Sequence, residues 1–187
     1  AVLAAAEHIP DGDMLVLPGD TPLVTGEALE GLAREHQTTE SVATVLTMAL
    51  DDPTGYGRIV RYPDGAVARI VEHRDANENQ RAIREVNTGM FVLPAPLTLD
   101  ILRTVESDND QGEIYLTDVV AGLCSRGEHV AASLISDPDL VLGVNSRVEL
   151  ARAEALLSMR IKTAWMLAGV TIVAPEPTIP MSRCSQT

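Results

Sequence analysis

The stretch Met14-Leu-Val-Leu-Pro-Gly-Asp-Thr-Pro22 decides the fold class, because it joins a short apolar run directly to a turn cluster. The continuous apolar run Met14–Leu17 predicts a β-strand covered on both faces, and the prolines and glycine after it predict a turn. A helix is expected next, with Thr25 as its N-cap, and the β-branched segment Ser41–Ala49 predicts a second strand. Strand, helix and strand in this order indicate a right-handed crossover, a parallel sheet and an α/β fold.

The middle of the chain has a different pattern. Residues 57–62 and 66–71 are short strand-like runs joined by Pro63-Asp-Gly65, which predicts a β-hairpin. A polar helix is expected over residues 75–84, with Asp75 as its cap. The elements expected after it are a strand over 86–93, a helix over 97–105, a helix over 113–126 ended by Gly127, a strand over 130–135 and a short apolar segment over 140–144.

The last predicted helix, over residues 147–168, is the longest. Ser146 and Glu149 are spaced as a capping box, and Gly169 stands where a C-cap glycine belongs. At about 1.5 Å per residue this helix would be a rod of roughly 33 Å. The apolar residues on broadly one side of it are Val148, Ala151, Ala155, Leu157, Ile161, Ala164, Trp165 and Ala168.

Composition excludes several classes of protein. The 187 residues allow one ordinary α/β domain, or a domain with a short appendage. The 27 acidic residues exceed the 14 basic ones and give a net charge of −13, which argues against binding of the nucleic-acid backbone. Aromatic residues make up only 3%, which argues against a surface that stacks single-stranded bases.

The sequence also bears on location. No basic-then-apolar leader opens the chain, and the most apolar stretch, 164–174, is too short to span a bilayer, so we expect a cytoplasmic protein without membrane contact. Cys124 and Cys184 have no short-spaced cysteine or histidine neighbours, which favours incidental thiols over a zinc site or a disulfide framework.

Two polar residues are candidate metal ligands. Asp20 directly follows the first predicted strand, at the carboxyl edge where open α/β sheets bind ligands. A carboxylate there suits a hard cation such as Mg²⁺, and the side-chain oxygen of Asn145, before the long helix, suits a second ligand facing Asp20. The alternative is that Gly19-Asp20 is an ordinary turn and that Asn145 is a turn residue before an N-cap.

Three further positions are candidates for binding a sugar or a nucleotide. In Gly55-Tyr-Gly57 the two glycines would let the backbone approach a planar ligand closely. Glu72 and Asn87 stand at strand boundaries, and their acceptor and donor groups suit sugar hydroxyls and an acetamido group. Each could equally be a loop glycine or a strand-end surface residue. No serine or cysteine has a histidine at a recognisable motif spacing, so no nucleophile–base pair is predicted.

Taken together, seven segments resemble the bacterial bifunctional N-acetylglucosamine-1-phosphate uridyltransferase/glucosamine-1-phosphate acetyltransferase family. They occur in the family's order across about residues 10 to 173. The matching stretches are Gly19-Asp-Thr-Pro22, Leu50-Asp-Asp-Pro-Thr-Gly-Tyr-Gly-Arg-Ile59, Ile70-Val-Glu-His73, Arg84-Glu-Val-Asn-Thr-Gly89, Gln111-Gly-Glu-Ile-Tyr-Leu-Thr-Asp118, Gly143-Val-Asn-Ser-Arg147 and Leu167-Ala-Gly-Val170.

This resemblance implies a Rossmann-like nucleotidyltransferase (nucleotide-diphospho-sugar transferase) fold and a specific reaction. UTP and N-acetylglucosamine 1-phosphate would give UDP-N-acetylglucosamine, which feeds peptidoglycan and cell wall synthesis, and pyrophosphate. Asp20 and Asn145 are implied to be catalytic and to hold Mg²⁺. The substrate-binding residues that the resemblance implies are Gly19, Asp20, Tyr56, Gly57, Glu72, Asn87, Thr88 and Asn145. In-line attack on the α-phosphorus needs positioning and charge neutralisation more than covalent chemistry.

The family also has parts with no match in the chain, namely its glycine-rich nucleotide loop, its uracil-contacting segments and its acetyltransferase β-helix. We therefore expect an N-terminally incomplete nucleotidyltransferase domain over 1–146, a long C-terminal linker helix over 147–168 and a tail over 169–187 that is the stub of a β-helix domain. The chain alone is expected to be inactive. It is also expected to be monomeric, because trimerisation of full-length relatives belongs largely to the β-helix.

Three alternatives remain open from the sequence. The chain could be a related sugar-1-phosphate nucleotidyltransferase with another base or sugar. It could be a non-catalytic sugar-nucleotide-binding or scaffold domain, although such a domain would be expected to lack the metal ligands. It could also be a degenerate fragment that folds poorly, for which a cooperative melt is the discriminating observation.

Overall fold

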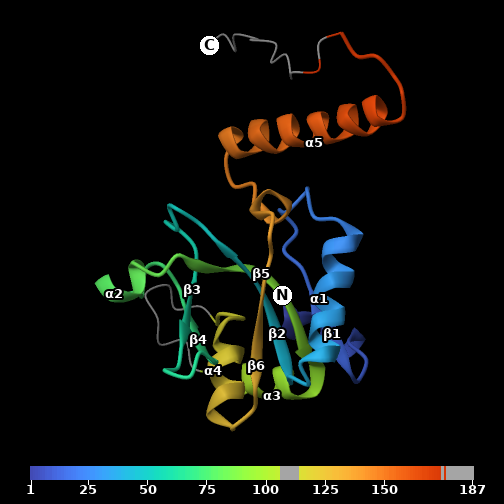
Figure 1. Cartoon of the computed structure of the whole chain (residues 1–187). Coiled ribbons are helices and arrows are strands. Elements are labelled where there is room, and N and C mark those ends of the chain that lie inside the picture. Colours follow the sequence, from blue (N-terminus) through green and yellow to red (C-terminus); the bar gives the residue numbers. More distant parts are fainter. Residues whose placement is uncertain (106–113, 174, 176–187) are drawn as a thin grey trace, which may run out of the picture.

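The computed structural model describes residues 1–105, 114–173 and 175 (Figure 1). The strands are β1 (Asp13–Val16), β2 (Ala43–Ala49), β3 (Arg58–Arg61), β4 (Val67–Val71), β5 (Glu85–Pro94) and β6 (Val130–Leu134). The helices are α1 (Gly26–Thr38), α2 (Glu78–Arg81), α3 (Ala95–Thr104), α4 (Asp118–Ser125) and α5 (Arg147–Leu167), with the 3₁₀ helices η1 (Val2–His8) and η2 (Pro138–Val141).

Within the described residues, the strands form one mixed sheet in the order β4-β3-β5-β2-β6, and β1 also pairs with β5. The long strand β5 is antiparallel to β1, β2 and β3, whereas β2 and β6 are parallel. Val86 pairs with both β2 and β3, and Phe91 pairs with both β1 and β2, so β1 and β3 share the edge of β5 opposite β2.

The α/β class is confirmed, but the parallel pairing expected from the first strand, helix and strand is not found between β1 and β2. Strands β1 and β2 run in the same direction, as a crossover requires, yet β5 lies between them and is antiparallel to both. The local pattern of strand, helix and strand could not reveal this, because β5 comes later in the chain and inserts between the two earlier strands.

Turn and cap residues account for most of the element boundaries. The predicted hairpin is present as β3 and β4, and Gly65 in its turn has a φ of 93°, which favours glycine. Thr25 caps α1 as predicted, accepting a hydrogen bond from the Ala28 amide at 3.3 Å.

Two predicted helices are shorter than expected. Helix α2 begins after Asn77, not Asp75, because Asn77 and Gln80 form a reciprocal capping box. Helix α4 begins at Asp118, and residue 113, where it was predicted to begin, lies outside the described residues. Gly127, with a φ of 81°, follows the end of α4 as predicted.

Helix α5 agrees with its predicted span to within a residue and lies apart from the sheet (Figure 1). Its contacts to the body include an ion pair between Arg152 and Asp139 at 2.7 Å and a hydrogen bond from Arg160 to the Leu23 carbonyl at 3.1 Å. The predicted apolar side is largely exposed, with Trp165 at 58%. Most of the tail predicted over 169–187 lies outside the described residues.

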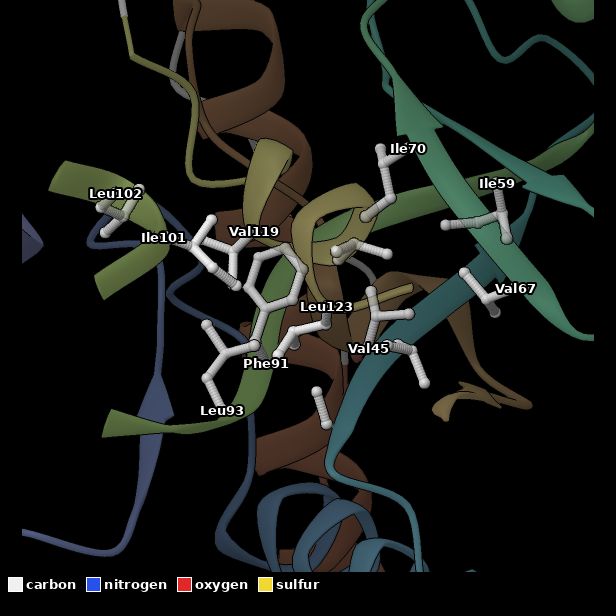
Figure 2. Close-up of a cluster of buried hydrophobic side chains, with 13 residues drawn as sticks. Val45, Ile59, Val67, Ile70, Phe91, Leu93, Ile101, Leu102, Val119 and Leu123 are labelled. Atoms are coloured by element: carbon white, nitrogen blue, oxygen red, sulfur yellow. The ribbon is translucent and has the colours of Figure 1, made fainter. Parts of the chain in front are cut away.

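The core has two parts because the sheet is covered on both faces. Side chains alternate between the faces along a strand, so Phe91 and Leu93 of β5 point into one cluster and Met90 and Val92 into the other. Figure 2 shows the first cluster, in which Phe91 and Leu93 meet side chains of α3 and α4. The second cluster includes Leu32 of α1. The sheet held between these layers is a rigid support for the turns at its edge.

Candidate active site

Asp20 and Asn145 lie near each other, where the turn after β1 adjoins the segment before α5. The turn after β1 is tied to the segment before α5 by a hydrogen bond from the Val144 amide to the Asp20 carbonyl at 2.9 Å. Gly143 lies beside both side chains: a Cβ built on it would stand 3.6 Å from Asp20 Oδ2 and 3.5 Å from Asn145 Nδ2. Both side chains are exposed to solvent. The structure therefore brings together the two residues that were predicted as metal ligands.

The start of α5 fixes the position of Asn145. Ser146 caps the helix and accepts from the Glu149 amide at 3.2 Å, as predicted. The Glu149 carboxylate, however, accepts from the Asn145 amide at 2.7 Å, one residue earlier than the predicted capping box requires. The hydrogen bond that the Asn145 backbone donates to the Glu149 carboxylate, followed by a contribution from the Ser146 hydroxyl, holds the pKa of Glu149 below its usual value. The carboxylate thereby orders the backbone of a predicted metal ligand.

Tyr56 lies near this pair. Burial raises the pKa of the Tyr56 phenol above its usual value, and the negative charges of Glu149 and Asp20 raise it further. The ring also packs against the second core cluster. Tyr56 is thus a half-buried wall residue on the side of Asp20 and Asn145.

Gly57 and Glu72 form a second group. Gly57 is buried, and a Cβ on it would stand 3.0 Å from Ile70 Cγ2 and 3.3 Å from Glu72 Oε1, so a larger residue would press on this carboxylate. Thr117 donates a hydrogen bond to Glu72 Oε1 at 3.0 Å. The Glu72 carboxylate is therefore held between the backbone of Gly57 and the hydroxyl of Thr117.

Asn87 joins the same group. The backbone amide of Asn87 donates to the Gly57 carbonyl at 2.8 Å. Its side-chain Oδ1 accepts from the backbone amide of Gly89 at 2.9 Å. A Cβ on Gly89 would stand only 2.9 Å from Pro18 Cγ, so the turn that carries Asp20 packs directly on the Asn87–Gly89 segment. This contact connects the two groups of candidate residues.

A cavity of about 740 Å³ lies between these segments. Its polar lining residues include Glu72, Asn87 and Thr117, and Pro18 and Gly89 also line it. The apolar lining residues are Val2, Leu3, Val16, Leu17, Phe91, Leu102, Ile114 and Leu116. The volume and the convergence of a few polar groups on one side are typical of a small-molecule site.

Two of the predicted substrate-binding residues, Thr88 and Gly19, do not line this cavity. The side chain of Thr88 is turned away from it, because successive side chains of a strand point to opposite faces. Its hydroxyl donates to the Leu46 carbonyl at 2.8 Å and accepts from the Met90 amide at 3.2 Å. Gly19 is exposed in the turn, and no atom lies within 4 Å of a Cβ built on it.

The sequence interpretation overlooked Arg58 and Thr117. Arg58 is 1% exposed, and its guanidinium donates to the Tyr56 carbonyl and to His73 Nδ1, the latter at 3.3 Å. Burial lowers the pKa of this guanidinium below its usual value. Both residues stand inside the segments that carry the family resemblance, and that position was the signal that could have singled them out.

The donor set at Asp20 and Asn145 fits Mg²⁺. This ion binds oxygen ligands and is often held by one or two protein side chains together with substrate phosphates and water. Rotation of the Asn145 amide by half a turn exchanges Oδ1 and Nδ2, so either atom can face Asp20. Within the described ranges, no group of three or more His, Cys, Asp or Glu side chains could hold a metal by itself. A metal here would depend on substrate oxygens.

A mixed α/β sheet with polar side chains at its edge and a cavity beside it is an arrangement found in nucleotide-binding enzymes. The chain belongs to the nucleotidyl transferase family, whose model matches residues 1–166. This confirms the expected class of enzyme, and curated relatives confirm the resemblance more narrowly.

Those relatives are proteins named bifunctional protein GlmU. The chain is 51% identical over 169 residues to the protein of Streptomyces coelicolor, 46% identical over 180 residues to that of Geobacillus thermodenitrificans and 45% identical over 168 residues to that of Streptococcus suis. These alignments cover 90%, 95% and 90% of the chain. They cover only 35%, 39% and 36% of the relatives, so the chain corresponds to about a third of a GlmU protein.

Solved structures share the fold. UDP-glucose pyrophosphorylase of Acinetobacter baumannii superposes with a TM-score of 0.62 at 20% identity, over 91% of this chain and 61% of that one. A UTP-bound structure of the enzyme from the same organism gives a TM-score of 0.62 at 19% identity. At such low identity these likenesses establish the nucleotidyltransferase fold. None of the helices in the described ranges combines the length and the apolar character needed to cross a bilayer.

Proposed function

We propose that this chain carries the sugar-nucleotide site of a Mg²⁺-dependent UTP:N-acetylglucosamine-1-phosphate uridyltransferase. The observation that carries the proposal is the convergence of Asp20 and Asn145 beside Gly143, next to the segment that presents Asn87. The resemblance of the sequence segments to the uridyltransferase family supports the choice of sugar and base, and the GlmU relatives support the family itself.

In the proposed reaction, a phosphate oxygen of N-acetylglucosamine 1-phosphate forms a bond to the α-phosphorus of UTP. The bond between the α-phosphorus and the bridging oxygen to the β-phosphorus breaks, and pyrophosphate leaves with that electron pair. Such a transfer depends on alignment and on neutralisation of charge. Asp20 and Asn145 would hold Mg²⁺, which supplies neutralisation of the phosphate charges.

The protein groups have separate tasks in this proposal. Glu72 accepts hydrogen bonds from sugar hydroxyls, and Asn87 offers an amide to the sugar or to its acetamido group. The absence of a side chain at Gly57 leaves room for the Glu72 carboxylate to lie against the backbone beside the sugar. Tyr56 closes the side near Asp20. Because the proposed substrates are charged metabolites that do not cross membranes unaided, the proposal places the reaction in the cytoplasm.

Binding measurements test the proposal without requiring turnover. Isothermal titration of the chain with UDP-N-acetylglucosamine and Mg²⁺ should give one site per chain. UDP-glucose and dTDP-glucose should bind at least about tenfold more weakly, because a site that hydrogen-bonds an acetamido group leaves polar atoms unpaired with glucose. Equal binding of all three ligands would favour a nucleotidyltransferase of another specificity, and tight binding without any dependence on Mg²⁺ would contradict the metal assignment.

Turnover is a separate test. In the natural full-length protein, Asp20→Ala should abolish pyrophosphate release from UTP and N-acetylglucosamine 1-phosphate, whereas Asp11→Ala, an exposed aspartate outside the site, should leave it unchanged. Retained activity in Asp20→Ala would overturn the assignment. Binding of UDP-N-acetylglucosamine without any pyrophosphate release by the full-length protein would favour the non-catalytic binding domain instead.

A further inference from the structure

The hydroxyl of Thr117 has an unusual hydrogen-bond partner for an N-cap residue. Thr117 is the N-cap of α4, where a threonine hydroxyl ordinarily accepts from a backbone amide in the first helical turn. Here the side chain makes no capping hydrogen bond. It donates instead to Glu72 Oε1 at 3.0 Å, across 45 positions of sequence. The Thr117 hydroxyl is therefore hydrogen-bonded to Glu72 and does not cap α4.

The environment makes this contact specific. Thr117 is only 7% exposed, so its hydroxyl is directed by packing and not by solvent. Glu72 directly follows strand β4, and its carboxylate also lies against Gly57, where a Cβ would stand 3.3 Å from Oε1 and 3.4 Å from Oε2. Thr117 and Glu72 line the same cavity. The carboxylate thus has a backbone on one side and a buried donor on the other.

We propose that Thr117 is a positioning residue that holds the Glu72 carboxylate in the orientation that receives the sugar hydroxyls. This inference rests on the proposed function, since it assigns a task to a residue of that sugar site. A carboxylate has acceptor sites for about four hydrogen bonds, so Glu72 can accept from Thr117 and from a ligand together. Fixing the side chain before binding removes the entropy cost of ordering it when the sugar arrives.

The first test compares two variants of Thr117. Thr117→Val keeps the shape but removes the donor, and should weaken binding of UDP-N-acetylglucosamine by about tenfold or more, the loss typical of a hydrogen bond to a charged group. Thr117→Ser restores the donor and should bind within about threefold of the wild type. Binding by Thr117→Val that equals the wild type would overturn the inference. So would an equal loss in Thr117→Ser, because shape and not the donor would then be decisive.

The second test is a double-mutant cycle that combines Thr117→Val with Glu72→Ala. The thermal denaturation of each variant is measured without ligand. Thr117→Val should lower Tm by about 3 °C or more when Glu72 is present and should change it little when residue 72 is alanine. Additive effects would show that Thr117 acts independently of Glu72 and would overturn the inference.

The two tests also separate failure of this inference from failure of the proposed function. If the wild-type chain does not bind UDP-N-acetylglucosamine, the proposed function fails and the positioning role in sugar binding fails with it. If the wild type binds and Thr117→Val binds equally well, only the positioning role fails. A coupled denaturation cycle together with a selective loss of binding in Thr117→Val supports both.

Discussion

The backbone amide of Val144 donates to the carbonyl of Asp20 at 2.9 Å, and this hydrogen bond joins the turn after β1 to the segment before α5. Two polar residues far apart in the sequence, Asp20 and Asn145, thereby lie beside the same glycine, Gly143. In the proposed enzyme this junction holds the metal, while Glu72 and Asn87 bind the sugar. Each part of this arrangement can be tested by substitution.

Asp20→Asn should remove the negative charge from the metal site without affecting the fold. Because Asp20 is exposed, Tm should change little. A bound metal contributes several kcal/mol of charge stabilisation, so Mg²⁺-dependent binding of UDP-N-acetylglucosamine should fall by about a hundredfold. Titration calorimetry measures this, with Asp11→Asn as a control of equal charge change. An equal effect in both variants would show that net charge, not the metal site, is responsible.

Gly143→Ala should disturb the metal site while leaving the fold intact. The new methyl group would lie in ordinary van der Waals contact with both Asp20 Oδ2, at 3.6 Å, and Asn145 Nδ2, at 3.5 Å. It would occupy the space between the two ligands. We expect an unchanged melting temperature and a loss of Mg²⁺-dependent binding by about tenfold or more. Normal Mg²⁺-dependent binding would mean that the metal does not lie between these side chains.

Gly57→Ala should affect both stability and binding. The added Cβ would stand 3.0 Å from Ile70 Cγ2 and 3.3 Å from Glu72 Oε1, so either the strand or the carboxylate must move. Overpacking of this kind costs about 1–3 kcal/mol of unfolding free energy, which urea denaturation measures. Gly31→Ala is the matched control, since it lies in α1 with nothing within 4 Å of its Cβ, and it should stabilise the chain slightly. An unchanged unfolding free energy and unchanged binding in Gly57→Ala would contradict the close contact with Glu72.

Arg58→Lys should destabilise the chain although it keeps the charge. The guanidinium donates to both the Tyr56 carbonyl and His73 Nδ1, and one ammonium cannot reproduce this fork. Leaving a buried acceptor without its donor costs about 1–3 kcal/mol of unfolding free energy. Arg34→Lys, on the exposed side of α1, should change it by no more than about 0.5 kcal/mol. Equal unfolding midpoints for the two variants would argue against a tethering role for Arg58.

Glu149 should make the start of α5 sensitive to acid. Its pKa is lowered in the folded chain by hydrogen bonds from Asn145 and Ser146, so its stabilising contribution is present above the usual value of 4.5 and is lost as the pH falls through the lowered pKa. In Glu149→Gln, the decrease in Tm between pH 6 and pH 3 should therefore be smaller than in the wild type. Circular dichroism during heating measures this, and identical decreases would contradict the role of the carboxylate.

Local sequence signals predicted elements whose cause is local. Thr25 and Ser146 cap their helices, and Gly65 lies in the predicted hairpin turn, because each acts within a few residues of itself. Asp75 was the wrong cap because Asn77 has a partner, Gln80, at the spacing of a reciprocal box. The insertion of β5 between β1 and β2 depends on long-range pairing and leaves no local mark.

The candidate site shows the same division. The sequence offered Asp20 and Asn145 as facing metal ligands only beside the alternative of two ordinary turn residues. The family resemblance favoured the first interpretation, because the spacing of the two residues by itself predicts no contact. The resemblance implied that Thr88, like Asn87, binds the substrate, but alternation along β5 turns the Thr88 side chain to the other face of the sheet. The position of Thr117 inside a resembling segment could have marked the residue, but its hydrogen bond to Glu72 arises only because folding brings α4 beside the end of β4.

The most direct test of the central claim is a crystal structure of the chain with UDP-N-acetylglucosamine and Mn²⁺, which substitutes for Mg²⁺ and is located by its anomalous scattering. The account predicts one metal bound by Asp20, Asn145 and phosphate oxygens of the ligand, with sugar hydroxyls on Glu72. A metal held elsewhere, or a ligand that leaves the cavity beside Glu72 and Asn87 empty, would contradict it.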